Sequence, residues 1–181
     1  MSIQLANYAG KTFVSDCIKL ATYSQYSHSA ALFTQDMEVQ VDGKTHFIAA
    51  GSVIEAWQGG VKLASSLSEN HSSGTRVDLF EFKKHLTPEQ EQRMAAFLVR
   101  RIGQKYAYLN VIRFLPIVRL IMPEPLPIRY NRRHVYCSEL VLESTIDAGT
   151  PLLERCNPWE VPPRDLPRSP LVYLLKTVYT Q

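Results

Sequence analysis

Three residues of types that together can activate a thiol lie far apart in this chain: Cys137, His28 and Glu55. A thiol becomes a nucleophile when a nearby base takes its proton, and that base needs a partner that orients it. Cys137 stands at the start of a predicted helix, after Tyr136. The free N–H groups and the positive dipole end at such a position favour a thiolate and can hold an oxyanion. Taken alone, a single cysteine is more often a buried structural residue.

The other two residues are expected on strands. His28 opens a predicted strand, where its ring can face a cleft, although a histidine at a strand end is often an ordinary surface residue. Glu55 lies in Val53-Ile-Glu-Ala-Trp57, and strand alternation puts it on the same face as Val53 and Trp57. A carboxylate on an apolar face is costly unless it is paired. We therefore expect the imidazole of His28, on a neighbouring strand, to be its partner.

The composition is that of an ordinary globular protein. Its 181 residues suit one domain, 45% of them are hydrophobic and 20% are charged. The net charge is only +3, and the densest basic run, residues 129–133, has no aromatic ladder on which bases could stack. We interpret that run as a solvated loop and expect no nucleic-acid partner.

Cysteine usage and the chain start bear on the compartment. The three cysteines, Cys17, Cys137 and Cys156, are odd in number and show no metal-ligand spacing, and the five histidines are scattered. We expect no metal and no organic cofactor. Residues 1–5 do not resemble a signal peptide, and no window is apolar enough for a membrane span. These observations favour a reducing, cytoplasmic compartment.

The spacing of apolar residues predicts the elements that must position the three residues. A helix over 12–23 carries Phe13, Cys17 and Leu20 on one apolar stripe, so we expect Cys17 to be buried. Asp42-Gly43 predicts a hairpin. The other predicted elements are strands at 37–41, 45–49, 52–57 and 76–82, helices at 87–102, 106–114 and 137–148, an irregular proline-rich stretch at 116–127 and a strand at 171–178. This order predicts one α+β domain spanning 1–181.

Beyond these patterns, the sequences of several segments and their order along the chain resemble those of a known family. The chain is similar to the circularly permuted branch of the NlpC-type cysteine peptidases, the YiiX/YebB-like permuted papain-like amidases. In that branch the histidine strand precedes the cysteine helix, and here the order is His28, Glu55, Cys137. The matching segments are 15–18, 22–28, 53–57, 60–61, 102–106, 136–141 and 163–166. The most specific of them is Tyr136-Cys-Ser-Glu-Leu-Val141. The chain departs from the family at Ala107, where an aspartate is common.

The resemblance implies a papain-like (NlpC-type) fold, with an antiparallel sheet or half-barrel packed against helices. It also implies hydrolysis of a peptide or N-acyl amide bond through a thioacyl-enzyme intermediate. Cys137 would be the nucleophile, His28 the proton shuttle and Glu55 the residue that orients the imidazole. The backbone N–H of Cys137 is one expected oxyanion donor, and the hydroxyl of Tyr26 or Tyr136 is a candidate for the second.

Two other functions stay open. A related permuted group performs acyl chemistry on lipids, and the apolar stretch 111–128 could line an acyl pocket, although a packed surface segment is the commoner outcome. A peptidase for small peptides would instead need a clamp for the substrate carboxylate, for which Arg119 and Arg129 are candidates. The last alternative is a binding module with an idle site.

Overall fold

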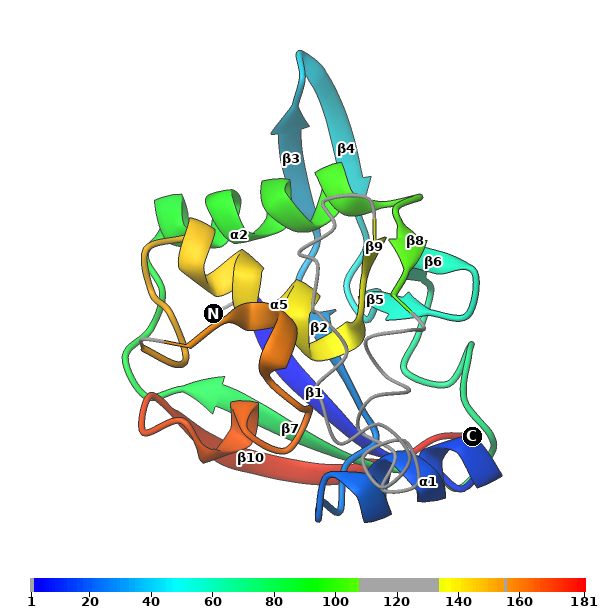
Figure 1. The fold of residues 1–181 in the computed structure, drawn as a ribbon. Coiled ribbons are helices and arrows are strands. Elements are labelled where there is room, and N and C mark those ends of the chain that lie inside the picture. The colour runs from blue at the N-terminus through cyan, green and yellow to red at the C-terminus, as the bar shows by residue number, and fades with distance from the viewer. Residues whose placement is uncertain (1, 108–133, 155) are drawn as a thin grey trace.

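A computed structural model describes residues 2–107, 134–154 and 156–181 of the chain. Its central feature is a six-stranded sheet with the order β10-β7-β1-β2-β5-β6, in which all neighbouring strands run antiparallel (Figure 1). The strands of this sheet are β1 (Ile3–Ala9), β2 (His28–Phe33), β5 (Val53–Trp57), β6 (Gly60–Ala64), β7 (Arg76–Phe82) and β10 (Val172–Tyr179).

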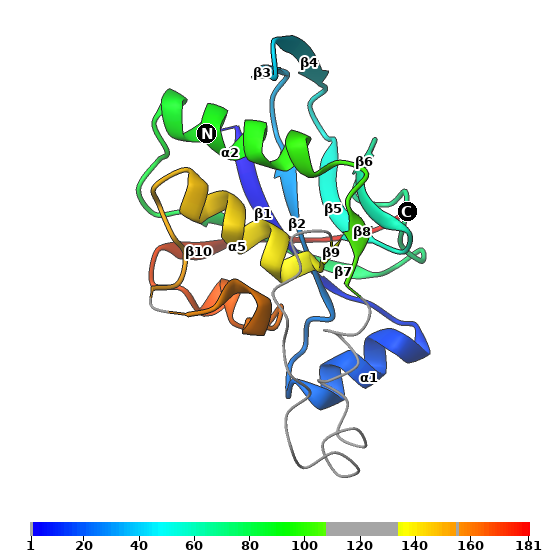
Figure 2. The ribbon, with the colours of Figure 1, turned by 45° about the horizontal axis from the view of Figure 1, so that its top comes forward.

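Helices α2 (Pro88–Arg101) and α5 (Cys137–Asp147) lie side by side over one face of this sheet (Figures 1 and 2). The fold is therefore α+β, with an antiparallel sheet packed against helices, as the sequence predicts. The remaining elements are α1 (Phe13–Ala21), the hairpin of β3 (Met37–Val41) and β4 (Lys44–Ile48), the short parallel pair β8 (Lys105–Tyr106) and β9 (His134–Val135), and the 3-10 turns η1 (Pro158–Glu160) and η2 (Leu166–Arg168).

Both faces of the sheet are buried. On the helix side, Leu5, Phe33 and Ile54 pack with Leu98 of α2 and Leu140 of α5. On the opposite side, a second cluster is made by Ala6, Tyr8, Ala30, Leu32, Val53, Ala64, Val77 and Leu79, and Leu67 packs against it. Leu67 belongs to the segment 65–75 that joins β6 to β7, so this connecting loop lies against the second face.

Strand β1 was not among the predicted elements. It lies between β7 and β2 in the middle of the sheet, and its residues are buried almost throughout. A strand that is covered on both faces has no need of polar and apolar alternation, so the period-two signal is absent. Gln4 and Asn7, polar residues within the run, weaken the apolar signal further.

Several local signals are confirmed. Thr87 and Gln90 form the reciprocal capping box at the start of α2. Asp42 and Gly43 both have positive φ angles, 49° and 76°, as the tight turn between β3 and β4 requires. Helix α5 begins at Cys137 as expected.

The prediction for the apolar stripe of α1 was wrong. The helix forms and Thr12 caps it, but Phe13 is 83% exposed, Leu20 is 68% exposed and Cys17 is only half-buried. Helix α1 lies at the end of the sheet and not over one of its faces (Figure 1). Amphipathic spacing shows that a helix has an apolar side, but it does not show what covers that side.

Two expectations for the second half fall on residues 108–133, outside the described part of the chain: the proline-rich stretch 116–127 and most of the helix predicted at 106–114. The first residue of that helix, Tyr106, lies in the short strand β8 instead. Among the described residues, no helix combines the length and the apolar character that crossing a membrane requires.

Candidate active site

An imidazole and a carboxylate are buried together between two neighbouring strands. Nε2 of His28, the first residue of β2, lies 2.6 Å from Oε2 of Glu55 in β5. Only 4% of the His28 side chain and 1% of the Glu55 side chain are exposed. Burial opposes ionisation of the carboxyl group, but hydrogen bonds from His28 and His71 outweigh it and hold the pKa of Glu55 well below its usual range. Glu55 is therefore a buried anion paired with an imidazole.

The third predicted residue, Cys137, meets the same imidazole from the helix side. Its side chain is buried at the N-terminus of α5. Burial favours the neutral thiol, but the charge and hydrogen bond of His28, together with backbone N–H groups of Ser29 and Ser138, lower the pKa of Cys137. Burial likewise lowers the pKa of His28, but interactions with Cys137 and then Glu55 raise it to about 10. The arrangement thus favours a thiolate beside an imidazolium.

Two further residues bind Glu55, and neither was identified from the sequence. Nε2 of His71 lies 3.0 Å from Oε2 of Glu55, and Nδ2 of Asn70 donates a 2.8 Å hydrogen bond to Oε1. Both belong to the loop 65–75. Burial lowers the pKa of His71, whereas the pKa of His28 is raised. A serine-rich loop carries no periodic signal, so only the tertiary fold shows that it contacts Glu55.

Aromatic rings enclose the two imidazoles. The ring of Tyr8 is stacked on His71 at 3.9 Å, and Trp57 meets His28 edge to face at 5.0 Å. The buried hydroxyl of Tyr8 has no hydrogen-bond partner among the described residues. Burial, and next the charge of Glu55, raise the pKa of Tyr8. These rings hold both imidazoles in place and exclude water from the carboxylate, which strengthens its interactions.

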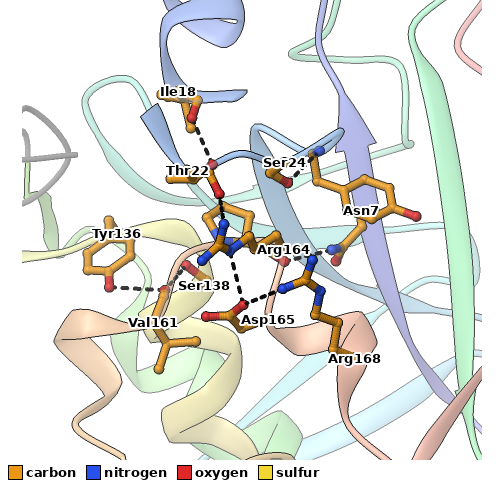
Figure 3. Close-up of polar contacts among 12 residues, drawn as sticks. Asn7, Ile18, Thr22, Ser24, Tyr136, Ser138, Val161, Arg164, Asp165 and Arg168 are labelled. Atoms are coloured by element: carbon orange, nitrogen blue, oxygen red, sulfur yellow. Dashed lines mark hydrogen bonds and ion pairs between the residues drawn. The ribbon is translucent and has the colours of Figure 1, made fainter. Parts of the chain in front are cut away.

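The two tyrosine hydroxyls proposed as oxyanion donors have other acceptors. The Tyr26 hydroxyl donates to Asp78 at 2.7 Å. The Tyr136 hydroxyl lies 3.1 Å from the carbonyl oxygen of Pro158 and 3.1 Å from that of Val161, and Figure 3 shows the contact with Val161. These contacts do not support either hydroxyl as an oxyanion donor. The groups that interact with the thiol itself include the backbone N–H groups of Ser29 and Ser138.

The two arginines proposed as a substrate clamp, Arg119 and Arg129, lie outside the described residues. So does the apolar stretch 111–128 that was proposed as an acyl pocket. The described part of the site therefore consists of the thiol, the two imidazoles, the carboxylate and Asn70.

The same side chains are also a possible donor set for a metal ion. One ligand atom each from His28, Glu55 and His71 lie within 4.8 Å of one another. Two imidazoles and a carboxylate are ligands that Zn²⁺ accepts. Two ligands on one tetrahedral zinc ion are about 3.3 Å apart, whereas the imidazole nitrogens lie 2.6 Å and 3.0 Å from the carboxylate oxygen. The residue types therefore suit a zinc ion, whereas the distances from the two imidazole nitrogens to the carboxylate oxygen are those of hydrogen bonds.

Comparison with known proteins gives a similar fold. No family model matches the sequence, and no curated protein matches it. Among solved structures, the chain is similar to the crystal structure of metalloprotein yiiX from Escherichia coli O157:H7, DUF1105, with a TM-score of 0.62 and 18% sequence identity. The match covers 100% of this chain and 97% of that one. The antiparallel sheet with its packed helices is thus a yiiX-like fold.

Proposed function

We propose that this chain is a cysteine hydrolase that cleaves an amide bond, in a peptide or an N-acyl compound, with Cys137, His28 and Glu55 as its catalytic residues. The observation that carries the proposal is the hydrogen-bonded series of thiol, imidazole and carboxylate. The three groups come from α5, β2 and β5, and all of them are buried. Such a series is the minimal apparatus for nucleophilic catalysis by a thiol.

The proposed reaction follows from the geometry. The Cys137 thiolate attacks the carbonyl carbon, and the resulting oxyanion accepts hydrogen bonds from backbone N–H groups at the start of α5. The His28 imidazolium gives its proton to the leaving amine as the C–N bond breaks, which leaves a thioester on Cys137. His28 then takes a proton from water, the hydroxide attacks the thioester, and the acid and the free thiol are released.

The roles of the ring nitrogens follow from the same contacts. Glu55 is bonded to Nε2 of His28, so Nδ1 is the nitrogen left for the thiol. The carboxylate fixes this orientation and stabilises the charge on the ring. The chain order of His28, Glu55 and then Cys137 is a cyclic permutation of the usual papain order, in which the nucleophile comes before the histidine. It supports the proposal that residues 1–181 form a single circularly permuted papain-like domain.

The experiment that tests the proposal compares the three thiols of one molecule. We expect iodoacetamide at neutral pH to alkylate Cys137 well before Cys17 or Cys156, measured by peptide mass spectrometry. The pKa of Cys156 is raised by its burial, so that thiol is an internal control. Replacing His28 with alanine should slow alkylation at Cys137 alone. Equal rates at the three thiols in the unmodified chain would refute an activated Cys137.

A second measurement tests acyl transfer. We expect p-nitrophenyl acetate to give a burst of p-nitrophenolate equal to the enzyme concentration and an acetyl group on Cys137. Amide and N-acyl substrates are then compared with phospholipids in turnover assays. Turnover of phospholipids alone would assign the site to lipid acyl chemistry. An alkylatable Cys137 with no burst and no turnover of either substrate class would leave only a binding module with an idle site.

Metal binding at His28, Glu55 and His71 is a second candidate function. It rests on the three converging ligand atoms and on the similarity of the fold to that of yiiX, a metalloprotein. A bound Zn²⁺ would supply Lewis acidity, and it would take Nε2 of His28 away from the carboxylate pairing. Calorimetric titration with Zn²⁺ tests this directly, with His71→Ala as the variant that removes a ligand but keeps the Cys137, His28 and Glu55 series. Zinc binding unaffected by His71→Ala would exclude this site.

A further inference from the structure

An open pocket of about 500 Å³ lies on the helix side of the sheet, apart from the thiol. Its walls come from the connection 23–26 between α1 and β2, from β7 and β10, and from the segment 164–168 around η2. Cys137, His28 and Glu55 are not among its lining residues. Three of the side chains that do line it are arginines: Arg76, Arg164 and Arg168.

The acidic group of this pocket is already fully engaged. Asp78 is buried, and Arg76 binds both of its carboxylate oxygens, at 3.0 Å and 2.6 Å. The hydroxyls of Tyr26 and Thr177 donate to the same carboxylate at 2.7 Å and 2.6 Å. Four donors on two oxygens satisfy this anion, so Asp78 fixes the pocket wall and is not an open cation site.

The other two arginines share one carboxylate. Asp165 lies between them, with Oδ1 3.2 Å from Nε of Arg164 and 3.7 Å from Nη1 of Arg168 (Figure 3). Arg164 also donates to the carbonyl oxygen of Thr22, which ties the segment 164–168 to the end of α1. The Arg168 side chain is 66% exposed. Arg164 is thus held rigidly by the fold, whereas Arg168 reaches from the rim.

Charge and donor count both favour an anion in this pocket. Three guanidinium groups are balanced by two carboxylates, Asp78 and Asp165. Each guanidinium has five N–H donors, and the contacts described use two of Arg76 and two of Arg164. The remaining donors are the planar pairs that match the oxygens of a carboxylate or phosphate group.

An apolar wall completes the pocket. Phe80 of β7, Pro167 of η2 and Leu174 of β10 line it beside the arginines, and Leu174 is 50% exposed. An inorganic ion would leave this surface in water. An organic anion would cover it while its charged group pairs with the guanidinium groups.

We propose that this pocket binds a small organic anion, with its carboxylate or phosphate group on Arg164 and Arg168 and its apolar part on Phe80 and Leu174. This proposal does not depend on the thiol chemistry proposed above, and the two proposals are tested by separate experiments.

The test uses phenyl phosphate and phenylacetate as probes and benzyl alcohol as their neutral counterpart. Chemical shifts of the protein are followed by NMR during each titration. We expect both anions to bind at millimolar concentration or tighter, with shifts confined to the pocket, and the neutral probe to bind much more weakly. Tighter binding of phenyl phosphate assigns a phosphate ligand, and tighter binding of phenylacetate assigns a carboxylate.

Arg168→Ala is the decisive variant, because its exposed side chain can be removed without loss of packing. We expect it to weaken anion binding by about fivefold or more, because a charge-assisted pair is lost. Arg100→Ala, an exposed arginine on α2, is the matched control and should leave the affinity unchanged. The proposal is overturned if Arg168→Ala and Arg100→Ala behave alike, if benzyl alcohol binds as well as the anions, or if neither anion binds at millimolar concentration.

Discussion

Glu55 and Asp78 are two carboxylates buried in the same sheet, and they differ in what neutralises them. Glu55 is bound by the imidazoles of His28 and His71 and by Asn70. Asp78 is bound by the guanidinium of Arg76 and by two hydroxyls. Both have a pKa held below the usual value, although burial opposes it in each case.

The difference between the partners separates a chemical role from a structural one. A guanidinium keeps its proton at any ordinary pH, so the pairing at Asp78 cannot exchange protons. An imidazole can gain and lose a proton near neutrality, so the pairing at Glu55 can support proton transfer. Only the imidazole of His28 also contacts a thiol. Burial of a carboxylate is therefore not in itself a sign of catalysis.

The largest expected effect is on acyl transfer in Glu55→Gln. Loss of the charge removes the support for the His28 imidazolium, and we expect thioester formation with p-nitrophenyl acetate to slow by about 100-fold. The matched variant Asp78→Asn should keep the rate within about twofold, because its site is separate. Stopped-flow measurement of the burst gives both rates. Equal losses in the two variants would remove the distinction between the two carboxylates.

The second expected effect is on stability, and it concerns Asp78 and not Glu55. Asp78→Asn weakens several hydrogen bonds to a buried charge, and we expect it to lower the free energy of unfolding by roughly 2 kcal/mol. Urea unfolding followed by circular dichroism measures this change. A loss below about 0.5 kcal/mol, the range of ordinary surface substitutions, would contradict the structural role.

A smaller expected effect concerns Asn70, which donates a hydrogen bond to Glu55. Asn70→Ala removes the donor to Oε1 but keeps both imidazoles, so we expect acylation to slow by about fivefold with the pH profile unchanged in shape. Ser73→Ala, an exposed change in the same loop, is the control. Asn70→Asp should not restore the rate, since it places a second carboxylate beside Glu55. An acylation rate as low as that of Glu55→Gln would mean that Asn70 does more than position the Glu55 carboxylate.

The smallest expected effect is the pH dependence, in acid, of the contribution that Asp78 makes to the stability of the fold. Its pKa is lower when folded than when unfolded, so the stability it contributes is fully present above the unfolded value of about 3.9 and is lost as the pH falls through the folded value. We expect the difference in melting temperature between the original chain and Asp78→Asn to be constant near neutrality and to shrink below about pH 4. A difference that grows on acidification would have the wrong sign for a lowered pKa.

Local signals in the sequence were enough for several parts of this protein. The capping residues of α2, the tight turn at Asp42-Gly43 and the start of α5 at Cys137 depend on neighbours a few residues away, and the structure has all three. Glu55 could be selected because a carboxylate on an apolar strand face needs a partner, wherever that partner comes from. These are statements about a residue and its immediate surroundings.

The tertiary structure alone decided the rest, because it depends on which distant segments meet. The loop that brings Asn70 and His71 to Glu55 has no sequence pattern that indicates this contact. The hydroxyls of Tyr26 and Tyr136 were suitable by chemistry, yet the fold pairs them with Asp78 and with the carbonyl oxygens of Pro158 and Val161. A sequence determines which groups require partners, whereas the chain path through the fold determines which partners they receive.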